Sequence, residues 1–260
     1  MARLAALCLA AALFQGNEDP IGKLKAPQVL AKTQPAWAKK KGCNLLVDIT
    51  SSLLAAELRG VEKAEYAGKL LRDFVVLKGS AEIYGRGAEK LVKQDNAYVE
   101  PRKAGTKLNR LAVIARNPAL VVAELFRFGG GATFGADEKV GDVDCRIVET
   151  AADERSVFEQ VKEVTGGLKS LDAYYIKDMS AITDRKKSTS TYKVWLSRTD
   201  LLPAKLEWTL TIVVNKKAIP FGADEVPDQF EASYVFLFTK YDTNLDVEIP
   251  PAVKQKFGAP

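Results

Sequence analysis

The sequence predicts a single α+β domain built around an antiparallel sheet. Strand patterns occupy residues 43–99 and return from residue 189, whereas the part between them is mostly helical in spacing. Neighbouring strand patterns are joined by short turns without a long helix, which favours antiparallel pairing. The two strand-rich parts need each other to complete a sheet, so we expect one domain over residues 43–260.

The first residues have the character of an export signal. Arg3 precedes an apolar run from Leu4 to Phe14, which is too short to span a bilayer. Residues 1–16 are therefore interpreted as a signal peptide, with a frayed N-terminal helix as the alternative. A bacterial lipobox needs a small residue before its cysteine, and Leu7 precedes Cys8, so we expect no lipid anchor there.

The next segments contain an irregular lead-in and then strands. Residues 17–42 mix three prolines with lysines and are expected to be irregular, with a short helix around residues 28–31. Alternation starts at Cys43 and continues to residue 99, with Gly and Asp-Asn turn signals. Residues 53–71 suit a helix or a strand, and we favour a strand.

The middle of the chain is predicted to hold two helices and a strand pair. Asn117-Pro118 is a helix start signal, and the helix is expected to end at Gly129 to Gly131. A strand pair follows around a tight Gly141-Asp142 turn. Residues 150–153 resemble a capping box for a second helix that ends near residue 166. Residues 171–179 are expected to add a short helical turn.

The last part of the chain returns to strands with unusually apolar faces. Residues 191–208 form two alternating runs and are interpreted as a hairpin. Residues 233–241 are apolar in both phases, and residues 245–253 are interpreted as a final strand. A strand that is apolar on both faces lies in a sheet covered on both sides, or has one face that lines a cavity.

The composition excludes several classes of function. The net charge is +5, and basic and acidic residues are interspersed, so we expect no nucleic-acid partner. The chain has no histidine, which rules out histidine-based triads, metal sites and general bases. We find no motif for a metal or another cofactor and no nucleophile with a base. The protein is expected not to be an enzyme, with a carboxylate hydrolase as the minor alternative.

Cys43 and Cys145 would remain after removal of a signal peptide. Each cysteine shares the apolar phase of its expected strand, so the two could meet inside the domain. That phase suits a disulfide and a pair of buried free thiols equally well, and the sequence leaves both alternatives open.

Several motifs in the second half, in this order, resemble the LolA-like superfamily of periplasmic lipoprotein carriers and outer-membrane lipoprotein-sorting proteins. The match extends from about residue 115 to residue 251, and the first half matches only in its strand-rich character. The residues that carry it are Asn117-Pro118, Val140 to Cys145, Val194-Trp195-Leu196, Leu202 to Glu207, and Tyr241 to Pro250.

The resemblance implies a strongly curved antiparallel sheet, an unclosed half-barrel, with helices covering its concave face and acyl chains held between. The residues expected to line the cavity are Leu206, Trp208, Leu210, Ile212, Phe236 and Phe238, and those expected to form the lid are Leu120, Leu125 and Phe128. The family also uses an arginine beneath the sheet to hold the lid shut. No arginine aligns with it, and Arg146 and Arg198 are unaligned candidates.

The function implied by the resemblance is a non-catalytic exported carrier of lipid or of lipoprotein acyl chains, in the periplasm or cell envelope. The alternative is an interaction or stress-sensing module on the same fold, with a filled interior and no lipid ligand. For the carrier, the partners would be a lipid or lipidated protein and a membrane-bound donor or acceptor. A monomer is expected.

Overall fold

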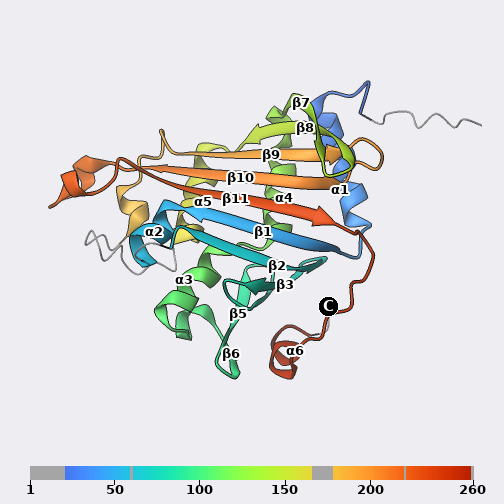
Figure 1. The fold of residues 1–260 in the computed structure, drawn as a ribbon. Coiled ribbons are helices and arrows are strands. Elements are labelled where there is room, and N and C mark those ends of the chain that lie inside the picture. Colours follow the sequence, from blue (N-terminus) through green and yellow to red (C-terminus); the bar gives the residue numbers. More distant parts are fainter. Residues whose placement is uncertain (1–20, 59–60, 166–177, 220, 259–260) are drawn as a thin grey trace, which may run out of the picture.

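The computed structural model describes residues 21–58, 61–165, 178–219 and 221–258 of the 260-residue chain. In these residues eleven strands form one antiparallel sheet in the order β6-β5-β4-β3-β2-β1-β11-β10-β9-β8-β7 (Figure 1). The edge strands β6 and β7 are not paired with each other, so the curved sheet is open. The predicted α+β class and unclosed half-barrel are confirmed. The strands are β1 (Cys43–Ser51), β2 (Lys63–Leu71), β3 (Phe74–Gly79), β4 (Ile83–Arg86), β5 (Glu89–Gln94), β6 (Ala97–Val99), β7 (Thr133–Val140), β8 (Val143–Ala151), β9 (Thr189–Ser197), β10 (Pro203–Val213) and β11 (Gln229–Thr239).

Strands β1 and β11 lie side by side in the middle of the sheet and join its two halves (Figure 1). Their antiparallel register places Val47 opposite Phe236 and Ile49 opposite Tyr234. Directly opposed side chains on one face of a sheet pack against each other. The N-terminal and C-terminal strands therefore share one continuous apolar surface, as the sequence predicts.

One face of the sheet is covered by helices, and we call it the covered face. Figure 1 shows α4 and α5 running behind the central strands. Apolar side chains from α1 to α5 join those of the sheet in a single large core cluster. The helices are α1 (Ala26–Ala38), α2 (Ser52–Leu58), α3 (Thr106–Ile114), α4 (Pro118–Arg127), α5 (Glu154–Thr165) and α6 (Pro251–Phe257).

The opposite face carries two smaller apolar clusters. Near β3 and β4, side chains of the sheet pack against α6, including a T-shaped contact between Phe74 and Phe257 with ring centroids 6.0 Å apart. Near β8 and β9, Trp195 is buried with Cys145, and Lys193 and Lys205 lie across its ring. The long lysine side chains keep this outer tryptophan out of water.

The helix start predicted at Asn117-Pro118 is confirmed by α4. The side-chain oxygen of Asn117 accepts a hydrogen bond from the backbone N–H of Ala119 at 3.0 Å, which is a typical N-cap. Its amide nitrogen also donates to the carbonyl oxygens of Asp73 and Gly87. The cap therefore fixes the start of α4 against the β2–β3 and β4–β5 turns.

Four local predictions differ from the structure. Residues 26–38 form a 13-residue helix in place of an irregular lead-in with a short helix. Residues 52–58 are helical, so only the second part of the 53–71 segment is a strand. Residues 245–250 are not a strand, and α6 follows them.

In the fourth, the side chain that caps α5 is Asp153, which accepts from Ser156 N, and not Thr150. The other three differences arise because short apolar runs fit both the helical and the strand periodicity, and tertiary packing decides between the two. The predicted turn at residues 171–179 lies mostly outside the described residues.

The β2–β3 pair brings two backbones unusually close at Gly68, which predicts a specific sensitivity. A Cβ at this position would lie 1.8 Å from the carbonyl oxygen of Val76. We expect Gly68→Ala to lower the free energy of unfolding by about 2–3 kcal/mol, because the strands must separate to admit the methyl group. Chemical denaturation measures the change. Gly131→Ala, where a Cβ meets nothing within 4 Å, is the matched control, and equal effects of the two changes would contradict the prediction.

Candidate functional site

The six residues predicted to line a cavity all lie on the covered face. Their exposed fractions are 0–3% and they belong to the large core cluster. They are packed beneath the helices of the covered face. The side chains in question are Leu206, Trp208, Leu210 and Ile212 on β10, and Phe236 and Phe238 on β11.

Three of these residues, Trp208, Phe236 and Phe238, belong to a row of aromatic rings that crosses β9 and β10 and continues along β11, and we call it the aromatic row. The register places Trp208 opposite both Tyr234 and Tyr192. The ring centroids of Trp208 lie 4.5 Å from Tyr234 and 6.3 Å from Tyr192. Along β11 the row continues from Tyr234 through Phe236 to Phe238, with successive spacings of 6.2 and 6.4 Å. The five neighbouring rings of the row form one continuous aromatic surface.

The hydroxyl of Tyr234 interrupts this apolar surface. It is buried, and no described residue forms a hydrogen bond with it. Burial raises the pKa of Tyr234, so the phenol stays protonated. A buried hydroxyl without a partner destabilises the folded protein by about 1–3 kcal/mol.

The predicted lid residues come from α4 and its end. Leu125 and Phe128 are buried in the core cluster, and the ring centroid of Phe128 lies 5.7 Å from that of Tyr192. Leu120 is only half-buried. Val121 and Val122 are buried beside Leu125 on the inward side of α4.

A polar junction connects the covering helices to the aromatic row, and sequence reasoning did not identify it. Arg116 immediately precedes Asn117, the N-cap of α4, and its side chain is 1% exposed. It makes two hydrogen bonds to Glu124 of α4, at 2.9 and 3.1 Å, and two to Glu163 of α5, at 2.6 and 3.1 Å. Its guanidinium lies over the ring of Trp208, 4.4 Å from the centroid. We call Arg116, Glu124 and Glu163 the arginine junction.

The arginine junction is also bonded to the sheet. The hydroxyl of Tyr192 on β9 donates to Glu124 Oε2 at 2.7 Å, and the amide nitrogen of Gln160 donates to the same oxygen at 3.0 Å. One residue of α4 therefore receives bonds from Arg116, from α5 and from the sheet. Helices α4 and α5 are hydrogen-bonded to the covered face of the sheet at this point.

The junction shifts the titration of its members. Burial by itself would raise the pKa of Glu124, but the hydrogen bond and charge of Arg116 hold that pKa below its ordinary value of 4.5. Burial also opposes the charge of Arg116, yet its bonds to Glu124 and the charge of Glu163 raise the pKa of the guanidinium. Both groups are thus charged over the neutral pH range.

The two arginines proposed from the sequence do not occupy this position. Arg146 and Arg198 each bond to Asp137 on β7, at 2.7 Å, near the sheet edge. Asp137 is about half exposed, so these are surface ion pairs. The only sequence signal for Arg116 was its place next to the Asn117-Pro118 cap.

Cys43 and Cys145 are free thiols in the structure, so the disulfide that the sequence left open is not formed. Cys43 belongs to the core under the covered face, whereas Cys145 belongs to the outer cluster around Trp195. The sheet separates them. The alternation placed each cysteine among the apolar residues of its strand. Because both faces of this sheet carry apolar residues, that placement did not show whether the two cysteines lie on the same face.

The described residues contain no group of three or more His, Cys, Asp or Glu side chains that could hold a metal ion. Nor does any helix within them have the length and apolar character needed to cross a membrane. The predicted signal peptide and Cys8 lie outside the described residues.

No protein-family model and no curated protein matches the chain. Solved structures do. The lipoprotein LppX of Mycobacterium tuberculosis is 12% identical with a TM-score of 0.42, over 85% of this chain and 99% of that one. LprF from Mycobacterium bovis is 11% identical with a TM-score of 0.40, over 87% and 97% of the two chains.

A LolA superfamily protein from Nitrosomonas europaea is 11% identical with a TM-score of 0.28, over 88% and 97% of the two chains. The ligand of this chain is argued below from its own residues.

The burial of Arg116 predicts a large effect of its removal. Arg116→Met leaves Glu124 partly buried without its cation, so we expect the free energy of unfolding to fall by about 3 kcal/mol. Glu163→Gln should cost less than about 1 kcal/mol, because the Glu163 side chain is 42% exposed. Chemical denaturation measures both, with Arg198→Met as the control for loss of a surface pair. An effect of Arg116→Met no larger than that of the control would contradict the role of the junction.

The lowered pKa of Glu124 predicts an acid sensitivity. Its contribution to stability is complete above the pKa of the unfolded chain and is lost as the pH falls through the lower pKa of the folded state. We expect the melting temperature of the wild-type protein to fall more steeply from about pH 5 to pH 3 than that of Glu124→Gln. Melting curves across this range make the comparison, and parallel curves would show that Glu124 is not held in its charged form.

Proposed function

We propose that this protein is a non-catalytic carrier that holds an acyl chain of a lipid or of a lipidated protein between the covered face and helices α4 and α5. The observation that carries the proposal is the aromatic row, which lies beneath a helical cover fastened by the arginine junction. An acyl chain laid along this surface gains about 0.8 kcal/mol for each buried methylene. Affinity of this kind needs no catalytic side chain.

The polar contacts of the arginine junction support the proposal that α4 and α5 can move away from the sheet. A buried ion pair contributes less to stability than well-packed apolar side chains of the same volume would. Arg116 and Glu124 therefore fix the position of α4 and α5 on the sheet. They stabilise this contact less than a wholly apolar contact of the same size would. The unpaired hydroxyl of Tyr234 adds a second site where the closed interior is less than fully satisfied. Both features lower the free energy needed to lift the helices from the sheet.

Transfer of an acyl chain would require a donor and an acceptor. The proposal therefore includes export to the periplasm or cell envelope, on the basis of the apolar run from Leu4 to Phe14, and contact with a membrane-bound donor or acceptor. It also includes action as a monomer. The interior could then receive the chain from one membrane partner and release it to another.

The alternative is an interaction or stress-sensing module with a permanently filled interior. It is favoured by the 0–3% exposure of the six predicted wall residues. In that case the aromatic row is ordinary core, and the cover does not admit a ligand.

The position of two tryptophans separates the alternatives. Trp208 lies on the covered face and Trp195 on the opposite face, and the chain has three tryptophans in all. We therefore consider two single-tryptophan proteins. One has Trp37→Phe and Trp195→Phe and keeps Trp208, whereas the other has Trp37→Phe and Trp208→Phe and keeps Trp195.

A brominated hexadecanoate should quench the fluorescence of the protein that keeps Trp208, with saturation, and should leave the protein that keeps Trp195 nearly unchanged. The reason is that bromine quenches only at close range, and the two rings lie on opposite faces of the sheet. Fluorescence titration of delipidated protein measures both. Absence of saturable quenching of Trp208 would reject the carrier and favour the filled interior.

A further inference from the structure

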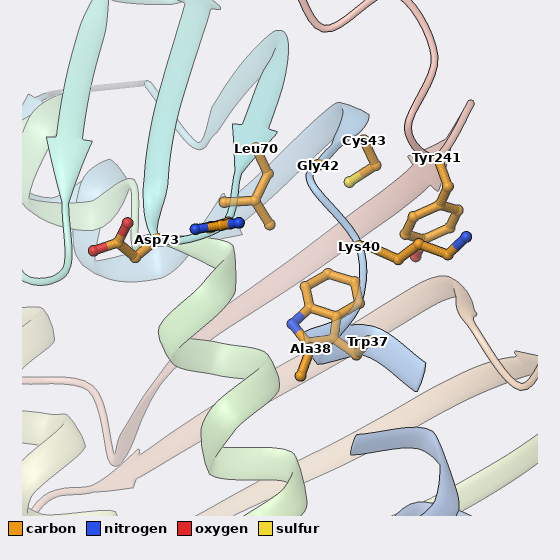
Figure 2. A pocket seen from close by; sticks show the side chains of 9 residues that line it. Trp37, Ala38, Lys40, Gly42, Cys43, Leu70, Asp73 and Tyr241 are labelled. Carbon is orange, nitrogen blue, oxygen red and sulfur yellow. The ribbon is translucent and has the colours of Figure 1, made fainter. Parts of the chain in front are cut away.

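A pocket of about 300 Å³ lies at the end of the aromatic row, outside the residues assigned above. Figure 2 shows Trp37, Cys43, Leu70 and Tyr241 around it. The pocket lies where the end of α1, the start of β1, the end of β2 and the segment after β11 meet. Its walls are therefore built by both halves of the chain.

The apolar side of the pocket is continuous with the interior. Cys43 and Leu70 are opposite each other in the β1–β2 pair and belong to the same core cluster as the aromatic row. The ring of Trp37 makes T-shaped contacts with Phe238, at 5.5 Å between centroids, and with Tyr241, at 6.1 Å. Trp37 thus lies between the pocket and the last ring of the aromatic row.

The rim of the pocket carries two cations, Lys40 and Arg72, and one carboxylate, Asp73. Lys40 is paired with Asp242 at 3.2 Å, and Asp73 lies 3.7 Å from Arg86. Among the described residues we find no ion-pair or hydrogen-bond partner for the guanidinium of Arg72. The charge available to a ligand is therefore that of Arg72, which is positive.

Arg72 lies in a tight turn at the edge of the pocket. Arg72 and Asp73 form the two-residue turn between β2 and β3, in which Leu71 is opposite Phe74. Arg72 has a φ of 59°, a left-handed conformation that favours glycine. A positive φ at the first residue is what a two-residue hairpin turn requires.

From these observations we infer that the pocket binds the anionic head of a single-chain amphiphile. Arg72 pairs with the carboxylate or phosphate of the head, and the first methylenes lie against Trp37, Leu70 and Tyr241. A pocket of this size is at the lower end of small-molecule sites, which span about 300–1,000 Å³. The rest of the chain therefore extends past Trp37 towards Phe238. The inference rests on the proposed acyl-binding function and assigns the head group and the point of entry.

The test compares three ligands with the same chain length and different heads: dodecanoate, dodecyl phosphate and the uncharged monododecanoylglycerol. Each is titrated below its micelle threshold into delipidated wild-type protein, Arg72→Glu and Lys63→Glu, with calorimetric detection. Lys63 is an exposed residue at the start of β2, and Arg72 follows the other end of that strand, so Lys63 controls for the change in net charge. Melting curves check that each variant is folded.

We expect the wild-type protein to bind at least one of the anions about tenfold more tightly than the monoglyceride, because one nearby charge at a protein surface contributes on this scale. Arg72→Glu should remove this preference and leave the affinity for the monoglyceride unchanged, while Lys63→Glu should behave as wild type. The anion that is preferred identifies the head as a carboxylate or a phosphate.

Equal effects of Arg72→Glu and Lys63→Glu on anion affinity, with all ligands still bound, would overturn the head-group site and leave the carrier function intact. Failure of the wild-type protein to bind any of the three ligands would overturn both.

Discussion

The pairing of β1 with β11 is the contact on which the rest of the structure depends. It joins residues 44–51 to residues 232–239, nearly two hundred positions apart in the chain. Without it, β1–β6 and β7–β11 would be two separate sheets with exposed edges. With it, Leu45, Val47 and Ile49 extend the surface formed by Phe238, Phe236 and Tyr234. The covered face, the helices that pack on it and the pocket beside β1 all depend on this pairing of β1 with β11.

The covered face combines apolar packing with a single concentrated polar contact. Most of the contact between sheet and helices is apolar side chain against apolar side chain, which has no preferred direction. The arginine junction is directional, since Arg116 forms paired bonds with Glu124 and Glu163 and lies over Trp208. The apolar contacts supply most of the stabilisation between the helices and the sheet, and the bonds of the arginine junction determine the position of the helices. In the proposed carrier, an acyl chain that enters between the helices and the sheet would replace apolar contacts, and the few directional bonds of the arginine junction would have to break for α4 and α5 to move.

The sequence contained enough information for most of the strands and for their antiparallel pairing, because alternation with period two is strong in residues 191–208 and 233–239. It also assigned the six residues predicted to line a cavity to one apolar phase of each strand, and the register places both phases on the same face. It could not tell which apolar phase faces the helices, since Trp195 and Cys145 are as buried as Trp208 and Cys43. The arginine junction was not predictable either, because its members come from a linker and two helices and meet only in the folded chain. For the same reason α1 was underestimated: Val29 and Leu30 become core residues only when α1 packs against the sheet.

The most direct test of the central claim, that the interior accommodates an acyl chain, is native mass spectrometry of the intact protein, freshly purified without detergent. A carrier should give ions with the added mass of an acyl lipid, and delipidation should remove this mass while the protein remains folded. If the only species observed is the mass of the polypeptide, and added fatty acid produces no complex, the interior is a filled core and the account is wrong.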